Sequence, residues 1–183
     1  YHALVDQLGA QGTTFVLVLC CFIGGLSAGA LASPRVFGAL ERWTGERGLR
    51  NYGRIEIVIP VTVIGFYTLT RAPVESILGP FPWTETSIEG IIFFRPTGLS
   101  TLFELGLAVV AVGLPAFLMG TTFPYLCGLF PDQPGVPSRL YAANTLGASL
   151  AVIGTEFFGI TRFGWLGCLL IATFGNLLLG LYF

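Results

Sequence analysis

Long runs of apolar residues, separated by short polar segments, constrain the fold of this chain more than any other feature. A transmembrane helix needs about 20 mainly apolar residues to cross the hydrocarbon core of a bilayer. Such runs cover residues 13–32, 53–70, 99–120, 137–160 and 163–183. They predict an all-α fold: a polytopic membrane helix bundle of about five transmembrane helices, within a single integral-membrane domain over residues 1–183.

The composition agrees with a membrane protein and argues against nucleic-acid binding. Only 10% of the residues are charged, whereas an average soluble domain has about 25%. The 25 glycines suit membrane helices that pack closely through small residues. The formal net charge of −1 gives no electrostatic footprint for nucleic acid. Because the chain begins with Tyr1 and its single methionine is Met119, we expect a truncated, processed or partly observed chain.

The chain has few residues that could hold a metal or act as a nucleophile. Cys20 and Cys21 are adjacent, Cys127 and Cys168 stand apart, and the single histidine is His2. This supply does not make a zinc or haem ligand set, and no phosphate-binding loop is present. We therefore expect no catalytic residue, no metal and no cofactor, and we expect the four cysteines to be small buried hydrophobes.

The segment over residues 35–54 contains five of the nine arginines and orients the chain in the membrane. The positive-inside rule predicts that this loop is cytoplasmic and that the protein is a multi-pass protein of the inner (plasma) membrane. Ser33 and Pro34 are expected to end the first helix. Apolar residues then recur at helical spacing, which predicts a short interfacial helix, although a plain solvated loop explains so short a segment equally well. These apolar residues are Val36, Phe37, Leu40 and Trp43.

The segment over residues 71–98 is expected to lie outside the cell and carries two apolar patches, at residues 80–83 and 91–94. Loops of this length are usually functional or disordered. The apolar side chains could lie at the level of the lipid headgroups, or they could form a contact surface for another membrane protein subunit. The candidate contact residues are Phe81, Trp83, Ile91, Phe93 and Phe94.

Six polar residues lie inside the apolar runs and are the candidate buried polar or ligand site. Ionisable residues at such positions are costly and often functional. They could bind a cationic ligand, such as a polyamine, or protons. Alternatively, two of them form a buried structural ion pair, Glu56 with Arg139, and the others lie near the interfaces. The six residues are Glu56, Glu104, Arg139, Asn144, Glu156 and Asn176.

Asn144 also belongs to a face of small residues. Gly147, Ala151 and Gly154 follow it at helical spacing, so all four lie on one side of the predicted helix. Such a face predicts close helix packing with one interhelical hydrogen bond.

Residues 118–126 (LMGTTFPYL) and 138–148 (SRLYAANTLGA) resemble the membrane domain of bacterial spermidine-synthase-like proteins. Further similar segments lie over residues 22–29, 52–56 and 159–164, in the family's order, and residues 113–147 are the most specific part. In that family a cytoplasmic aminopropyltransferase domain follows the helices and binds decarboxylated S-adenosylmethionine and a polyamine. No such domain follows residue 183 in this sequence.

The resemblance therefore implies the family's membrane domain without its chemistry. Three functions remain open. The chain could be a non-catalytic accessory or scaffold subunit that contacts other membrane proteins. It could bind or transport a polyamine or another small cation. It could also be the membrane anchor of an aminopropyltransferase whose soluble domain lies outside this sequence.

Overall fold

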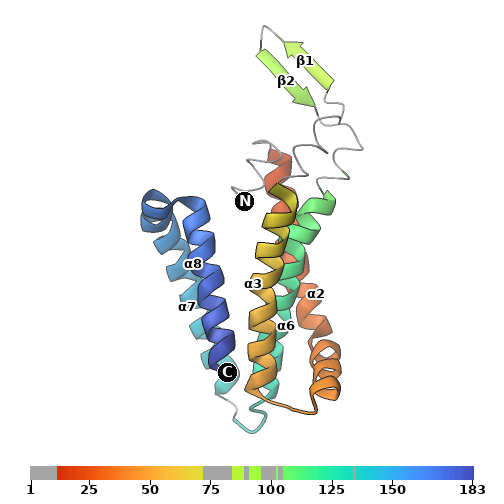
Figure 1. The fold of residues 1–183 in the computed structure, drawn as a ribbon, viewed down its shortest axis with the longest axis vertical. Coiled ribbons are helices and arrows are strands. Elements are labelled where there is room, and N and C mark those ends of the chain that lie inside the picture. Colours follow the sequence, from red (N-terminus) through yellow and green to blue (C-terminus); the bar gives the residue numbers. More distant parts are fainter. Residues whose placement is uncertain (1–11, 72–83, 89–90, 96–101, 103–104, 134) are drawn as a thin grey trace.

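The computed structural model describes residues 12–71, 84–88, 91–95, 102, 105–133 and 135–183, and these residues form mainly long helices (Figure 1). Three helices are long and apolar enough to cross a membrane: Val16–Thr44, Leu105–Gly128 and Val136–Tyr182. The expectation of a helical membrane bundle is confirmed to this extent. The expected count of five transmembrane helices is not supported, because within the described ranges only these three helices meet the criteria of length and apolarity.

Helix α2 (Gly12–Thr44) is longer than the sequence predicted. Ser33 and Pro34 do not end it, and the expected interfacial helix is the continuation of α2 itself. Proline removes one backbone N–H and displaces a carbonyl, but neighbouring helices can compensate in a membrane bundle. Here the buried Ser33 hydroxyl donates a hydrogen bond to the Thr121 carbonyl at 2.7 Å. This contact joins the helix to α6 beside the proline.

Helix α6 (Leu114–Gly128) follows directly from the π-helix η1 (Val109–Gly113). The expected end at Gly120 is wrong, because α6 continues through Pro124 to Gly128. α2 and α6 pack side by side (Figure 1). A Cβ atom at Gly29 would meet the Phe117 carbonyl, and one at Gly120 would meet the Leu26 carbonyl. Because glycine has no Cβ atom, the backbones of α2 and α6 can approach each other closely at this crossing.

Helix α3 (Leu49–Arg71) contains Pro60 and packs against α6 on one side and α8 on the other. Its crossing with α8 is again close, because Gly53 and Gly180 face one another's backbone carbonyls. The buried core gathers where α2, α3 and α6 meet. It consists of Phe37, Ile55, Ile59 and Tyr125.

The last part of the chain folds back on itself through α7 (Val136–Gly154), the π-helix η2 (Thr155–Gly159) and α8 (Ile160–Tyr182) (Figure 1). The sequence predicted the turn at residues 161 and 162, but the backbone is non-helical at Gly164, with φ 66° and ψ 173°. A positive φ is costly for residues with a Cβ atom, so glycine suits this position. The stretch Val136–Tyr182 is thus not a single straight rod.

Two short strands interrupt the otherwise helical structure. Strand β1 (Thr84–Ile88) pairs antiparallel with β2 (Ile91–Arg95) and forms a hairpin. The sequence predicted a loop over these residues, so the hairpin corrects that local prediction, while the other described elements are helices as predicted. Its strands contain Thr, Ile and Phe, which favour extended backbone.

Candidate functional site

The most densely connected polar group in the described residues lies at the turn between α2 and α3. We call it the turn cluster; it consists of Thr44, Glu46, Asn51, Arg54 and Tyr125. The Asn51 side chain is fully buried at 0% exposure. Its Nδ2 donates to the Glu46 carbonyl at 2.6 Å, and its Oδ1 accepts from Arg54 at 2.6 Å and from Thr44 at 3.3 Å. Asn51 therefore uses both ends of its amide to fix the turn.

Tyr125 connects α6 to the same turn. Its hydroxyl donates to the Gly48 carbonyl and accepts from the Gly48 N–H, both at 3.1 Å. Its ring stacks on Phe37 with the centroids 3.5 Å apart and the planes at 5°. The Tyr125 side chain thereby joins the end of α2, the turn and α6. The helical spacing of apolar residues near the end of α2 is explained in part by this contact, because Phe37 packs in the buried core.

Glu46 carries the ionic part of the turn cluster. Its carboxylate oxygens pair with Arg50 at 3.0 Å and with Arg54 at 3.3 Å. Among the described residues, no buried side-chain nitrogen or oxygen lacks a hydrogen-bond partner. The described residues also contain no group of three potential metal ligands. A cluster with satisfied donors and acceptors acts as a structural clamp, because no free group is aimed at a reactant.

Glu56 is the predicted site residue that the structure buries most deeply, at 7% exposure on α3. The Tyr52 side chain lies beside it, one helical turn earlier. The expected ion pair with Arg139 is not formed, and Arg139 is exposed near the start of α7. Both residues lie near the start of their apolar runs, 53–70 and 137–160, but position along a helix does not determine the direction in which its side chain points. Arg139 forms no ion pair with the described residues.

The other predicted polar residues do not converge on one site. Asn144 on α7 and Glu156 in η2 are exposed, and Asn176 on α8 is half-buried. Glu104 lies outside the described residues, as do Phe81 and Trp83. Within the described part of the chain, no shared cavity of acidic side chains for a cation is formed.

Strand β2 contains three of the predicted contact residues, Ile91, Phe93 and Phe94. In the hairpin register, Ile91 is opposite Ile88 and Phe93 is opposite Thr86. The hairpin lies beyond the ends of the helices (Figure 1).

Helix α7 is the unusual element of the fold. It contains no buried residue, and every residue from Tyr141 to Ile153 is exposed. Added Cβ atoms at Gly147 and Gly154 would meet nothing within 4 Å. Among the described residues, the face of Asn144, Gly147, Ala151 and Gly154 packs against no other helix, so the close helix packing and interhelical hydrogen bond expected of it are not found there.

The four cysteines are all free, and none is fully buried. Cys20 and Cys21 line an open groove of about 630 Å³ between α2 and η1, together with Gly24, Val110 and Phe117. This lining offers no charged group to orient a polar ligand. The groove is consistent with a surface that faces acyl chains.

Sequence reasoning missed the turn cluster. Asn51 and Tyr125 lie at the edges of apolar runs. Polar residues are common at such positions, so their presence does not indicate a buried cluster. The one available signal was the Gly-Glu-Arg-Gly turn over residues 45–48, because Gly45 and Gly48 have positive φ. No protein-family model, curated protein or solved structure matches this chain.

Proposed function

We propose that this chain is a non-catalytic membrane domain that acts as an accessory or scaffold subunit and binds another membrane protein through α7. The observation that carries the proposal is the exposure of α7 along its length. An apolar helix without a partner in its own chain is stable in lipid. The polar and small residues of this face, however, suit a second helix better than acyl chains.

Asn144 is the clearest of these residues. It lies eight residues after the start of α7, about 12 Å along the helix axis and therefore well inside a hydrocarbon core of about 30 Å. Its amide is exposed and makes no hydrogen bond to the described residues. A polar group in hydrocarbon without a partner costs free energy. A neighbouring helix that offers a hydrogen bond would remove this cost, and Gly147 and Gly154 would let its backbone approach.

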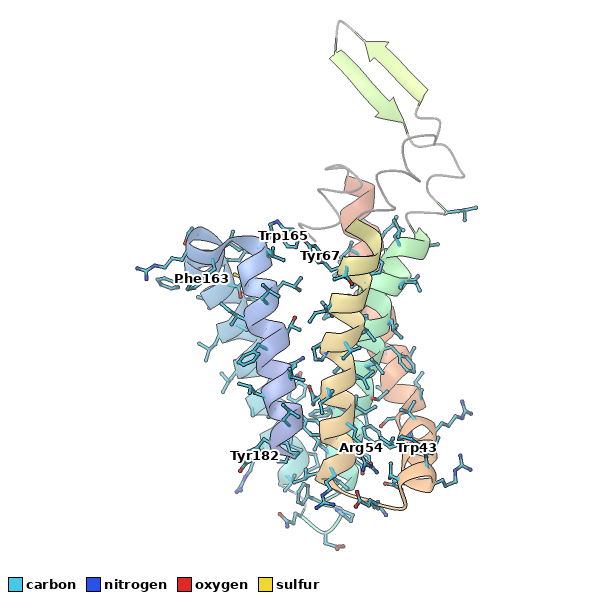
Figure 2. All side chains as sticks on the ribbon, in the orientation of Figure 1. Trp43, Arg54, Tyr67, Phe163, Trp165 and Tyr182 are labelled. Atoms are coloured by element: carbon cyan, nitrogen blue, oxygen red, sulfur yellow. The ribbon has the colours of Figure 1, made fainter. Side chains whose placement is uncertain are left out.

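The proposal includes five crossings of the membrane. α3 would cross as well, and Val136–Tyr182 would cross twice because it folds back at Gly164. The aromatic residues support this arrangement: Figure 2 places Trp43 and Tyr182 near one end of the helices, and Tyr67, Phe163 and Trp165 near the other. Tyr67 and Trp165 form an edge-to-face pair with their centroids 5.7 Å apart. Tyrosine and tryptophan are enriched at both membrane interfaces.

The orientation follows from charge. The end of α2, the following turn and the start of α3 contain five arginines and two glutamates, Glu41 and Glu46. The positive-inside rule places this end in the cytoplasm, in the inner (plasma) membrane. The resemblance of residues 113–147 to spermidine-synthase-like proteins supports an alternative role, as the membrane anchor of such an enzyme.

A second candidate function rests on Glu56. A carboxylate buried between membrane helices can bind a cation or proton, and a polyamine would be one such ligand. Its burial beside Tyr52 supports the structural alternative. Binding of spermidine to wild type but not to Glu56→Gln would favour this function over the scaffold.

The scaffold proposal is tested by photo-crosslinking in native membranes. A benzophenone amino acid is placed at Gly147 or at Ala151, and the control carries it at Val58, an exposed position of α3. We expect crosslinks to another membrane protein from α7 and only lipid adducts from Val58. Lipid adducts alone at all three positions, together with a monodisperse monomer in mild detergent, would contradict the proposal.

A further inference from the structure

The cytoplasmic end of α2 and the turn after it form an arginine-rich surface. We define this surface by Arg35, Arg42, Arg47 and Arg50, whose side chains are all exposed, together with Trp43, which is 82% exposed. From its charge, its position and its rigidity we infer that it binds the phosphate headgroups of anionic phospholipids in the adjoining leaflet. This inference rests on the proposed crossing of the membrane by α2 and α3.

The position of the surface follows from the length of α2. Its 33 residues span about 50 Å, whereas the hydrocarbon core is about 30 Å thick. If the apolar residues 13–32 occupy the core, the segment from Arg35 to Thr44 extends about 15 Å beyond it. The headgroup layer is about 5–8 Å thick on each side of the core, so Arg35 lies within it and the rest of the segment continues past it along the membrane surface. The exposed Trp43 on this segment has an apolar ring and an N–H donor, the combination typical of residues at membrane interfaces.

The charge of the surface is only partly compensated. Arg47 pairs with Glu41 at 3.6 Å, and Arg50 pairs with Glu46 at 3.0 Å. Both guanidinium groups remain open, since the side chains of Arg47 and Arg50 are 69% and 72% exposed. A guanidinium has five N–H donors, so one ion pair leaves donors for a phosphate. Clusters of four to eight basic residues next to a membrane helix are typical of anionic-lipid binding.

The turn cluster supplies the rigidity. Asn51 and Tyr125 fix the turn through hydrogen bonds to Glu46 and Gly48. Arg47 and Arg50 flank these fixed residues, so their backbone positions are set before a lipid arrives. A preorganised site loses less conformational entropy on binding than a flexible basic segment does.

The test measures lipid binding to the purified full chain by native mass spectrometry. The probes are phosphatidylglycerol, phosphatidylcholine and inorganic phosphate. The variant Arg35→Gln/Arg42→Gln/Arg47→Gln leaves the turn cluster intact. The control is Arg162→Gln, which removes an exposed arginine near the opposite end of the molecule. We expect wild type and Arg162→Gln to prefer phosphatidylglycerol, and the triple variant to bind it at least tenfold more weakly, since each basic residue contributes about fivefold.

Three results would overturn the inference. Equal binding of phosphatidylglycerol by wild type and the triple variant would show that the surface is not the site. Equal affinity for both lipids would show that charge does not select the lipid. Full competition by inorganic phosphate would identify a site for free phosphate. Reconstitution into vesicles separates these results from failure of the proposed function, because a chain that does not insert at all contradicts the membrane crossings themselves.

Discussion

At the scale of single residues, burial distinguishes two asparagines that look alike in the sequence. Asn51 is fully buried and hydrogen-bonded to Glu46, Arg54 and Thr44. Asn144 is exposed on α7 and has no such partner among the described residues. The sequence pointed to Asn144, because it interrupts an apolar run, and passed over Asn51, because it lies in a polar loop. The contacts that make Asn51 important come from the folded turn and are not encoded in local hydropathy.

We predict that Asn51→Ala lowers the free energy of unfolding by about 1–3 kcal/mol, because it leaves buried partners without a hydrogen bond. The measurement is thermal unfolding of the purified chain in detergent. Asn144→Ala removes the same amide from an exposed position and is the matched control, with an expected change within about 0.5 kcal/mol. Equal losses for the two variants would show that the turn cluster does not stabilise the fold.

At the scale of elements, hydropathy predicted where the helices run but not where they end. Pro34 was expected to end α2, and Gly120 to end α6, yet both helices continue. Hydropathy and proline describe one helix in isolation, whereas the ends of these helices depend on contacts between helices. Ser33 reaches Thr121, and Tyr125 reaches the turn at Gly48. Such contacts cannot be predicted from the sequence of one helix, because they depend on the position of the neighbouring helix.

Helix packing gives a second prediction. Gly29→Ala should destabilise the chain by about 1–3 kcal/mol, because its Cβ atom would overlap the Phe117 backbone on α6 and force the helices apart. Gly24→Ala is the control: it lies on the same helix, and its Cβ atom would meet nothing within 4 Å. Both variants gain the same helix propensity, so their difference reports the clash alone. If Gly24→Ala unfolds at the lower temperature, the close crossing of α2 and α6 is wrong.

At the scale of the whole molecule, the hydrogen bonds between Tyr125 and Gly48 place two turns at one end of the bundle. Residues 129–133 follow α6 directly, so they lie at the same end of the bundle as residues 45–48. The chain folds back between α7 and α8 at the other end (Figure 1). The distribution of arginines predicted that these turns lie at alternate ends. The exposure of α7 could not be predicted, because its apolar sequence is similar to that of a membrane helix packed inside a bundle.

Cysteine labelling tests this arrangement. After replacement of the four native cysteines, single cysteines are introduced at Arg47, Asp132 and Arg162, and intact cells are treated with a membrane-impermeant maleimide. We expect labelling at position 162 from outside and at positions 47 and 132 only after permeabilisation. Opposite accessibility of positions 47 and 132 would be incompatible with the contact between Tyr125 and Gly48.

The contact between Ser33 and Thr121 also has a consequence for the time at which the protein can form. The two residues are 88 positions apart in the chain. At a synthesis rate of about 5–20 residues per second, the ribosome needs about 4–18 s to make the intervening segment. During that interval α6 has not yet been made. We expect Gly29 and the Ser33 hydroxyl of α2 to contact lipid or another protein until α6 is inserted.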